Sequence, residues 1–593
     1  MIHPRFAAIV PSTIAGWHTD AANDLPASCL CNALLRETRR WQHLQSPGGP
    51  VIRLPVSAGV LWLRLRHISA SGECRFLWPA YFCARDGAAP RPLDFATLLE
   101  RVLESPALLA PCVAGRRETL RQWMLESHAR ILDSLAERDD LAHLQFGPLT
   151  FVEAEQGLLA DQAFHPTSGT GVPSDVEPPR CQGTGQGARV TLAWWAVAPR
   201  ALASASSRPR AAGELARALL PEALAGDLPA GFTPLPMHPW QARHLRRQPC
   251  VRAMEDDCRL VWLGESEAEW HPTSSPHVLY ATGAPWMVKG ALSSRRSPHL
   301  PSEGDAARGL QFDAWLGELD IARRFPGFAV MQEPAWLGWR DACGDTDPES
   351  LAVLRENPLV DAADSEMPVL AALVQQPVDQ AGLSLLGARL VEIASHHGET
   401  LAATARGWFA AYCEQVLTPL FGLLVEDGVV LLADRLSIVL RLDGGWPVGM
   451  YYRDGRGRGV TPHFLARHFE RIDAPPECLW DRETVRRRFP GHLLVDATLA
   501  VTGALAADRL VEESLLLADL RDHLDALRLR LSGDTDCLEH VLGAATLEVE
   551  NNLFGRLEST GGATPGGHYR PLINPLVADD DALDQPLHLG LHA

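Results

Sequence analysis

Hydrophobic residues recur at helical spacing in the first part of the chain and at strand spacing further on. Between Thr119 and Leu135 the apolar positions lie three and four residues apart, as on the buried face of a helix. We therefore predict a mainly helical region over residues 1–140. From about residue 141 to 340 the period shortens, which predicts strands separated by Pro- and Gly-rich turns. The predicted strands are Arg189–Ala198, Cys258–Leu263 and Pro285–Leu292.

The pattern of the C-terminal part predicts long helices around one hairpin. The predicted elements are a helix from His396 to Leu417, a hairpin of Ser437–Leu442 and Val448–Arg453, and an amphipathic helix over Leu515–Leu531. Two glycines after Asp443 suit the turn of that hairpin. Residues 343–365 are acidic and polar, which favours a surface insertion or a linker.

Length and charge narrow the class of protein. A chain of 593 residues implies several domains, because single cores stop growing at ~250–300 residues. The net charge of −19 argues against a nucleic-acid partner, since phosphate backbones are bound by basic surfaces. No apolar run reaches the ~18 residues of a membrane span, and the start of the chain lacks the apolar core of a signal peptide. We therefore expect a cytoplasmic protein that binds neither nucleic acid nor a membrane.

Lysine occurs once in the chain, at Lys289, whereas the other long cationic side chains are arginines. The remaining lysine is a candidate for a task that needs a compact charge on a flexible stem, such as contact with a phosphate. The alternating pattern around it predicts a strand, which would hold the ammonium on a rigid element. Drift in a compositionally biased genome is the alternative explanation.

Two polar segments are candidates for binding anions. His165 is followed by a proline and lies beside two hydroxyls and two glycines, so its imidazole could bind a carboxylate. A histidine that caps a turn is the alternative. The hydroxyl run Thr273–Ser275 offers donors for phosphate oxygens, and a hairpin would bring it near Lys289. An ordinary Ser/Thr turn explains that run equally well.

Asp454 follows the predicted C-terminal hairpin, at a strand end where it could hold a magnesium ion bound to nucleotide phosphates. Arg453, Arg456 and Arg458 add positive charge around it in an otherwise acidic protein. A plain Arg-Asp-Gly turn is the alternative. For His238, in a His-Pro-Trp segment, a structural role is favoured over a catalytic one.

Taken in order, these segments resemble the siderophore synthetases that work independently of nonribosomal peptide synthetases, the aerobactin-synthetase-like family. The resemblance covers most of the chain from about residue 140 onward, and it is carried by the order and spacing of the segments. Those segments are His165-Pro166, His238–Gln241, Thr273–Ser275, Val288-Lys289, Tyr412–Leu420, Leu424–Leu431 and Arg453–Gly455.

The resemblance implies an α+β fold shaped like a cupped hand, with a helical thumb (1–140), fingers with an antiparallel sheet (141–390) and a palm (391–593). Such enzymes use ATP and Mg²⁺ to adenylate a polycarboxylic acid such as citrate, and an amine or alcohol then displaces AMP. The implied site comprises Thr273, Ser274, Ser275, Lys289 and Arg453 for the nucleotide, Asp454 for the metal, and His165, Arg295 and Arg296 for the substrate. A homodimer or a partnership with another synthetase is also expected.

The sequence departs from the family pattern at positions that carry chemistry. The family histidine of the palm reads as Asp434, and an arginine that contacts the reacting carboxylate reads as Pro301. The other replaced positions are Gly169, Gly171, His277, Leu432 and Ser437. Neighbouring arginines are candidates to replace the lost charge, namely Arg295, Arg296, Arg435 and Arg441. Without such replacement the chain would be a catalytically silent paralogue, acting as a partner or binding protein for a true synthetase.

A relationship to the ferric-siderophore reductases is a further alternative for the C-terminal part. A reductase of that kind needs clustered cysteines for an iron–sulfur centre. Cys413, Cys478 and Cys537 are too far apart in sequence to suggest one.

Overall fold

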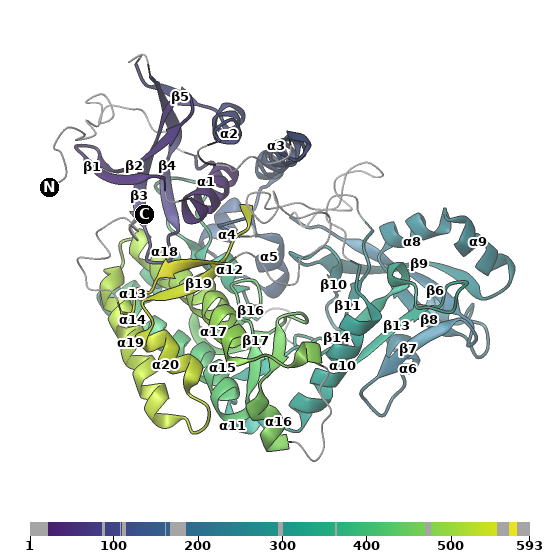
Figure 1. Cartoon of the computed structure of the whole chain (residues 1–593). Helices are drawn as coiled ribbons and strands as arrows, with labels where there is room; N and C mark the ends of the chain where they lie inside the picture. Colours follow the sequence, from purple (N-terminus) through teal and green to yellow (C-terminus); the bar gives the residue numbers. More distant parts are fainter. Residues whose placement is uncertain are drawn as a thin grey trace.

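The computed structural model describes residues 22–38, 40–85, 89–106, 108, 114–160, 162–165, 186–293, 300–361, 365–468, 476–553 and 569–577. Its helices and strands gather in three regions, an N-terminal unit, a large sheet and a C-terminal helical body (Figure 1). The N-terminal unit lies against one end of the helical body, and the large sheet extends from the side of the helical body (Figure 1). This mixture of helices and antiparallel sheets confirms the predicted α+β class.

The N-terminal unit is a five-stranded antiparallel sheet with helices on one side. Its elements are α1 (Leu25–Glu37), β1 (Gln42–Ser46), β2 (Gly49–Val56), β3 (Gly59–Ile68), β4 (Cys74–Ala84), β5 (Arg91–Leu93), α2 (Phe95–Leu103) and α3 (Ala114–Glu137). The prediction of a mainly helical region is therefore wrong for residues 42–93, although the helix over Thr119–Leu135 is confirmed as part of α3. Leu61, Leu63 and Leu65 are buried at every second position, and that strand signal was present in the sequence.

The large sheet has eight strands in the order β7-β13-β14-β11-β10-β9-β6-β8. The strands are β6 (Val190–Val197), β7 (Leu202–Ser206), β8 (Thr233–Met237), β9 (Leu260–Pro272), β10 (Val278–Tyr280), β11 (Trp286–Gly290), β13 (Ala335–Trp339) and β14 (Ala352–Glu356). The helices beside it are α6 (Ala212–Arg217), α7 (Glu222–Ala225), α8 (Pro239–Arg246), α9 (Pro249–Asp256) and α10 (Glu303–Gly317). The three strands predicted in this region are confirmed as β6, β9 and β11.

The segment 343–365 is not a linker, which corrects the prediction made from its polar composition. It contains β14, which lies inside the large sheet between β13 and β11. Residues 352–355 of this strand are all buried. The acidic residues that suggested a surface segment flank the strand, so average composition concealed a short buried run.

The C-terminal body is built of helices around a small sheet. Its helices are α12 (Leu370–Val374), α13 (Leu385–His397), α14 (Leu401–Tyr412), α15 (Thr418–Gly422), α16 (Pro462–His468), α17 (Arg482–Pro490), α18 (Leu499–Ala507), α19 (Glu513–Arg530) and α20 (Asp536–Gly543). Its strands are β15 (Val429–Leu431), β16 (Ile438–Asp443), β17 (Trp446–Tyr452), β18 (Arg458–Val460), β19 (Thr546–Glu550) and β20 (Tyr569–Ile573). The predicted hairpin and the helix over Leu515–Leu531 are confirmed as β16–β17 and α19.

The predicted start of the long helix at His396 is wrong. Helix α13 ends at His397, and Gly398 has φ of 67°, the left-handed conformation with which glycine ends helices. The next helix begins at Leu401 behind the cap Thr400, whose hydroxyl accepts the N–H of Ala403.

Several segments that precede the C-terminal body in sequence pack into its core. These are α4 (Leu141–Phe146), α5 (Phe151–Gln156), α10, α11 (Ile321–Arg324) and β12 (Phe328–Val330). Strand β12 pairs in parallel with β17, so the chain returns to this body after the first six strands of the large sheet. The boundaries of thumb, fingers and palm stay a prediction.

Two helical runs, Leu401–Asp427 and Arg482–Ala507, have the length and hydropathy of a membrane span. In each of them 78% of the apolar window is buried inside the protein. Their apolar residues belong to the largest core of the molecule. We therefore interpret both as core helices.

Candidate functional site

Lys289 lies on β11 in the middle of the large sheet, beside β14. In the register of this pair Lys289 faces Val353 and Met287 faces Arg355, so Lys289 and Arg355 are diagonal neighbours on one face of the sheet. Both reach the carboxylate of Glu333, which follows β12. Lys289 Nζ lies 3.1 Å from Glu333 Oε1, and Arg355 Nε and Nη2 donate to the same oxygen at 3.1 and 2.6 Å.

The cluster is buried, so its charges act strongly on one another. The side chains of Lys289 and Glu333 are 12% and 4% exposed. Burial alone would raise the pKa of Glu333, but the charges of Lys289, Arg355 and Arg458 outweigh it and hold that pKa well below its usual range. Burial lowers the pKa of Lys289, and Glu333 offsets this only in part because Arg355 repels the ammonium.

The turn between β17 and β18 meets the Lys289 cluster at Gly455. A Cβ atom at this position would lie 2.8 Å from Glu333 Oε2 and 3.0 Å from Lys289 Nζ, so a larger residue would displace these two side-chain ends. Asp454 folds the turn, because its carboxylate accepts the N–H groups of Arg456 and Gly457 at 2.9 and 2.8 Å. The turn that carries Asp454 therefore lies beside Lys289.

Arg453 and Ser274 are joined by a carboxylate that sequence reasoning missed. Glu155 on α5 is 1% exposed and lies with its Oε1 atom 2.7 Å from Arg453 Nη1. Its Oε2 atom accepts the N–H and the hydroxyl of Ser274, both at 2.9 Å. Arg453 Nη2 also reaches the Ser274 hydroxyl at 3.4 Å. A lone glutamate in a short helix gives no sequence signal for such a role.

The remaining predicted residues have different surroundings. The Thr273 hydroxyl donates to the carbonyl of Ser275 and accepts its N–H, the turn geometry that was the alternative for this run. His165 follows Phe164, whose ring centroid lies 3.0 Å from the guanidinium carbon of Arg36. Pro301 is buried just before α10. Arg295 and Arg296, like Gly169 and Gly171, lie outside the described residues.

Asp434, at the family's histidine position, closes a turn after β15. Its Oδ1 atom accepts N–H bonds from Leu436 and Ser437 at 3.0 and 2.8 Å and the Ser437 hydroxyl at 2.6 Å. Burial raises the pKa of Asp434, and the nearby carboxylate of Asp496 adds to that effect. Leu432 is 2% exposed and packs in the core.

Two arginines proposed as replacements are engaged elsewhere. The Arg435 side chain is 4% exposed; its Nη2 atom lies 3.1 Å from Glu73 Oε2 and its Nε atom donates to the carbonyl of Asp496 at 3.0 Å. Arg441 donates to the carbonyl of Val448 on the neighbouring strand. None of these three contacts involves the Lys289 cluster.

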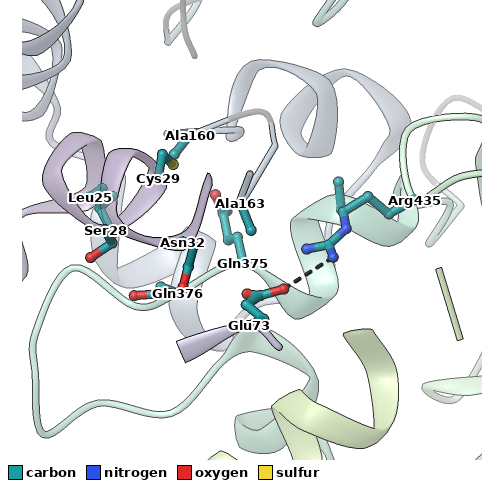
Figure 2. Close-up of a pocket in the computed structure, with 11 residues that line it drawn as sticks. Leu25, Ser28, Cys29, Asn32, Glu73, Ala160, Ala163, Gln375, Gln376 and Arg435 are labelled. Carbon is teal, nitrogen blue, oxygen red and sulfur yellow. Dashed lines mark hydrogen bonds and ion pairs between the residues drawn. The ribbon is translucent and has the colours of Figure 1, made fainter. Parts of the chain in front are cut away.

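Arg435 and Glu73 line a small cavity between α1, the start of β4 and the segment after α12 (Figure 2). Figure 2 shows Asn32, Gln375 and Gln376 around the same space, with the carboxylate of Glu73 directed at Arg435. The cavity has a volume of about 20 Å³, room for about one water molecule. It is too small for a nucleotide or a polycarboxylic acid.

The chemistry of the Lys289 cluster fits a nucleoside triphosphate. Gly455 allows backbone to approach the lysine, and the cluster supplies cationic donors of the kind that hold phosphate oxygens. The two oxygens of Asp454 offer about four lone-pair positions, of which two are taken by backbone N–H groups. Among the described residues there is no group of three or more metal-binding side chains, whereas Mg²⁺ is commonly held by one or two carboxylates plus phosphates and water.

Comparison with known proteins agrees with this fold. Residues 150–375 match the IucA / IucC family, and residues 406–564 match the family described as ferric iron reductase FhuF-like transporter. The ATP-bound aerobactin synthetase IucA from a hypervirulent pathotype of Klebsiella pneumoniae superposes with a TM-score of 0.88 at 33% identity, over 94% of this chain and 100% of that chain.

Three curated relatives match along almost their whole length. The N(2)-citryl-N(6)-acetyl-N(6)-hydroxylysine synthases of Vibrio mimicus and Escherichia coli are each 32% identical, over 94% of this chain and 96% and 99% of their own lengths. The rhizobactin siderophore biosynthesis protein RhbC of Rhizobium meliloti is 30% identical over 95% of this chain and 99% of its own. The fold and the site define an ATP-dependent siderophore synthetase. The chain belongs to the IucA/IucC family of siderophore synthetases that work independently of nonribosomal peptide synthetases.

Proposed function

We propose that this synthetase joins citrate to a hydroxylysine-type amine through a citryl adenylate, with Lys289 and the Asp454 turn holding the nucleotide. The observation that carries the proposal is the meeting of Lys289, Glu333 and Gly455 in one buried cluster. Full-length similarity to the citryl-hydroxylysine synthases supports the choice of substrates.

The reaction has two steps. A citrate carboxylate oxygen attacks the α-phosphorus of ATP, and pyrophosphate leaves. The amine then attacks the acyl carbon, AMP leaves with the carboxylate oxygen, and the amine gives up a proton. Lys289 supplies positive charge to phosphate oxygens in the first step, and preorganised charge of this kind commonly contributes more to catalysis than any other single effect. Asp454 is the residue we assign to Mg²⁺.

Arg453 and Ser274 form the second part of the proposed nucleotide site. Both contact Glu155, which fixes their positions relative to each other. The proposal leaves Thr273 and Ser275 as turn residues that orient Ser274. Roles in substrate binding for His165, Arg295 and Arg296 stay predictions, as do a cytoplasmic location and a homodimer or a complex with another synthetase.

A capture assay tests the function directly. The purified protein with ATP, Mg²⁺, citrate and hydroxylamine should form citryl hydroxamate, and N6-acetyl-N6-hydroxylysine should replace hydroxylamine to give an amide detectable by mass spectrometry. Omitting citrate is the control. Absence of both products, from protein that binds ATP, would favour the silent paralogue, an alternative that the comparisons do not support.

A further inference from the structure

We propose that Arg355 and Arg458 complete the anion-binding cluster around Lys289, with Arg355 donating to the phosphates of the nucleotide, Arg458 contributing its charge, and Glu333 as their internal counter-charge. This inference rests on the proposed function and names residues that neither the sequence motifs nor the comparisons assign. It also identifies the source of the positive charge that the motif positions Asp434 and Pro301 no longer supply.

The guanidinium groups of Arg355 and Arg458 come from different parts of the fold and lie near Glu333. Arg355 comes from β14 of the large sheet, and Arg458 opens β18 of the C-terminal body. They are 6% and 4% exposed. Arg458 donates from Nε to the backbone carbonyl of Asp454 at 2.6 Å, from Nη1 to Gln332 Oε1 at 3.4 Å and from Nη2 to the carbonyl of Met331 at 3.1 Å. Both arginines are thus held in place by contacts within the protein.

Donor groups remain available in the cluster. A guanidinium carries five N–H groups and an ammonium three. Arg355 directs Nε and Nη2 at Glu333, which leaves the N–H groups of Nη1 for another acceptor. Lys289 makes one hydrogen bond, also to Glu333, so two of its donors remain. A phosphate at this position would accept from both side chains.

The balance of charge points to an anionic ligand. Lys289, Arg355 and Arg458 are three cations around the single buried carboxylate of Glu333, and all three lower its pKa. Buried charge is costly unless it is paired. Asp454 and Glu356 are further carboxylates near these cations; Asp454 already accepts two backbone N–H groups, and Glu356 pairs with Arg208 at 2.7 Å. At Glu333 itself Lys289 and Arg355 share one carboxylate, and a nucleotide's phosphates would neutralise this local excess of positive charge.

Tripolyphosphate in EDTA isolates the phosphate contribution from the metal and from adenosine. Isothermal titration calorimetry of the full-length protein should show binding weakened at least tenfold by Arg355→Gln and by Arg458→Gln. Arg406→Gln is the matched control, because Arg406 forms an exposed ion pair with Asp519 away from the cluster. Glu333→Gln should have the opposite effect and tighten tripolyphosphate binding, a result that a purely structural ion pair does not produce.

Other outcomes overturn the inference in a recognisable way. Unchanged tripolyphosphate affinity in folded Arg355→Gln and Arg458→Gln proteins would refute it, as would a wild type that binds ATP with Mg²⁺ but not tripolyphosphate. Should a glutamine variant fail to fold, Arg355→Lys or Arg458→Lys keeps the charge without the planar fork and should weaken binding severalfold; equal affinity would again refute it. A wild type that does not bind ATP at all would instead refute the proposed function.

Discussion

Replacing Arg435 with methionine is expected to destabilise the protein strongly while leaving its affinity for ATP unchanged. Arg435 lies in the degenerate palm motif beside Asp434, so sequence reasoning made it a candidate for the active site. In the structure Arg435 instead forms an ion pair with Glu73 of the N-terminal unit, with 3.1 Å between Arg435 Nη2 and Glu73 Oε2. It also forms an ion pair with Asp496 of its own C-terminal body. The pair is buried, with side-chain exposures of 4% for Arg435 and 9% for Glu73.

The magnitude follows from the charge left behind. Methionine fills much of the arginine volume, so the main loss is electrostatic. Removing one partner of a buried ion pair costs ~3–5 kcal/mol when the other charge stays buried without compensation. The charges of Arg36 and Arg75 also act on Glu73, so we expect a loss at the lower end of that range. Neutralising Glu73 as well should recover part of that loss. We therefore expect Arg435→Met with Glu73→Gln to be less destabilising than the sum of the single changes, by ~0.5–3 kcal/mol.

Urea unfolding followed by tryptophan fluorescence, with hydrogen exchange of β4 as a local probe, measures the effect. Isothermal titration with ATP and Mg²⁺ on the folded variant measures affinity. A loss of stability below ~1 kcal/mol would refute the reasoning, since that is the size of an exposed pair. A large fall in ATP affinity at unchanged stability would return Arg435 to the nucleotide site.

The site and the pH response give further tests. Lys289→Ala should abolish the rise in melting temperature that millimolar ATP and Mg²⁺ produce by mass action, and Lys289→Arg should restore only part of it, as differential scanning fluorimetry would show. Gly455→Ala should weaken ATP binding in calorimetry because the new Cβ meets Glu333 and Lys289, whereas Gly317→Ala, with nothing within 4 Å, should not. Burial lowers the pKa of His238 to about 4, whereas in the unfolded chain it is ~6.5. Between these two pH values the unfolded chain binds a proton that the folded protein does not. The free energy of unfolding therefore falls by about 3 kcal/mol as the pH drops from 6.5 to 4. His238→Asn, which keeps an acceptor for the N–H of Trp240, should flatten that slope in urea unfolding; an unchanged slope would contradict the buried neutral imidazole.

The sequence predicted elements whose hydrophobic pattern is clear over their own length. Helix α19, strand β11 and the β16–β17 hairpin were found for that reason. The N-terminal sheet was missed although β3 and β4 have 10 and 11 residues, because the clear helical period of Thr119–Leu135 was extended to the whole of residues 1–140. Strand β14 was missed because acidic residues flank four buried positions. Composition averaged over a window therefore conceals a strand that only its partners β11 and β13 define.

The residues of the candidate site also differ in whether the sequence marks them. Lys289 and Asp454 were predicted because a unique residue type and a turn motif mark them; their segments meet at Gly455, and their roles stay predictions. Glu333 and Glu155 carry no local signal, since each becomes relevant only through a cation that is distant in sequence. Arg355 was hidden with its strand. Contacts across the fold were therefore the part of the site that one sequence did not predict.

The divergent palm motif is best understood as a redistribution of charge. Asp434 now closes a turn with Ser437, and Arg435 neutralises Glu73 and Asp496 at the joint with the N-terminal unit. These residues stabilise the arrangement of the parts, whereas the positive charge near Lys289 comes from β14 and β18. If this division is correct, Arg435→Met changes stability alone, whereas Arg355→Gln, which also breaks a buried ion pair, changes both stability and tripolyphosphate affinity. Their combination should lose stability by the sum of the two single losses and tripolyphosphate affinity by the factor of Arg355→Gln alone, because sites without shared partners behave additively. Coupling above ~0.5 kcal/mol between the two changes would show instead that the joint and the anion cluster form one network.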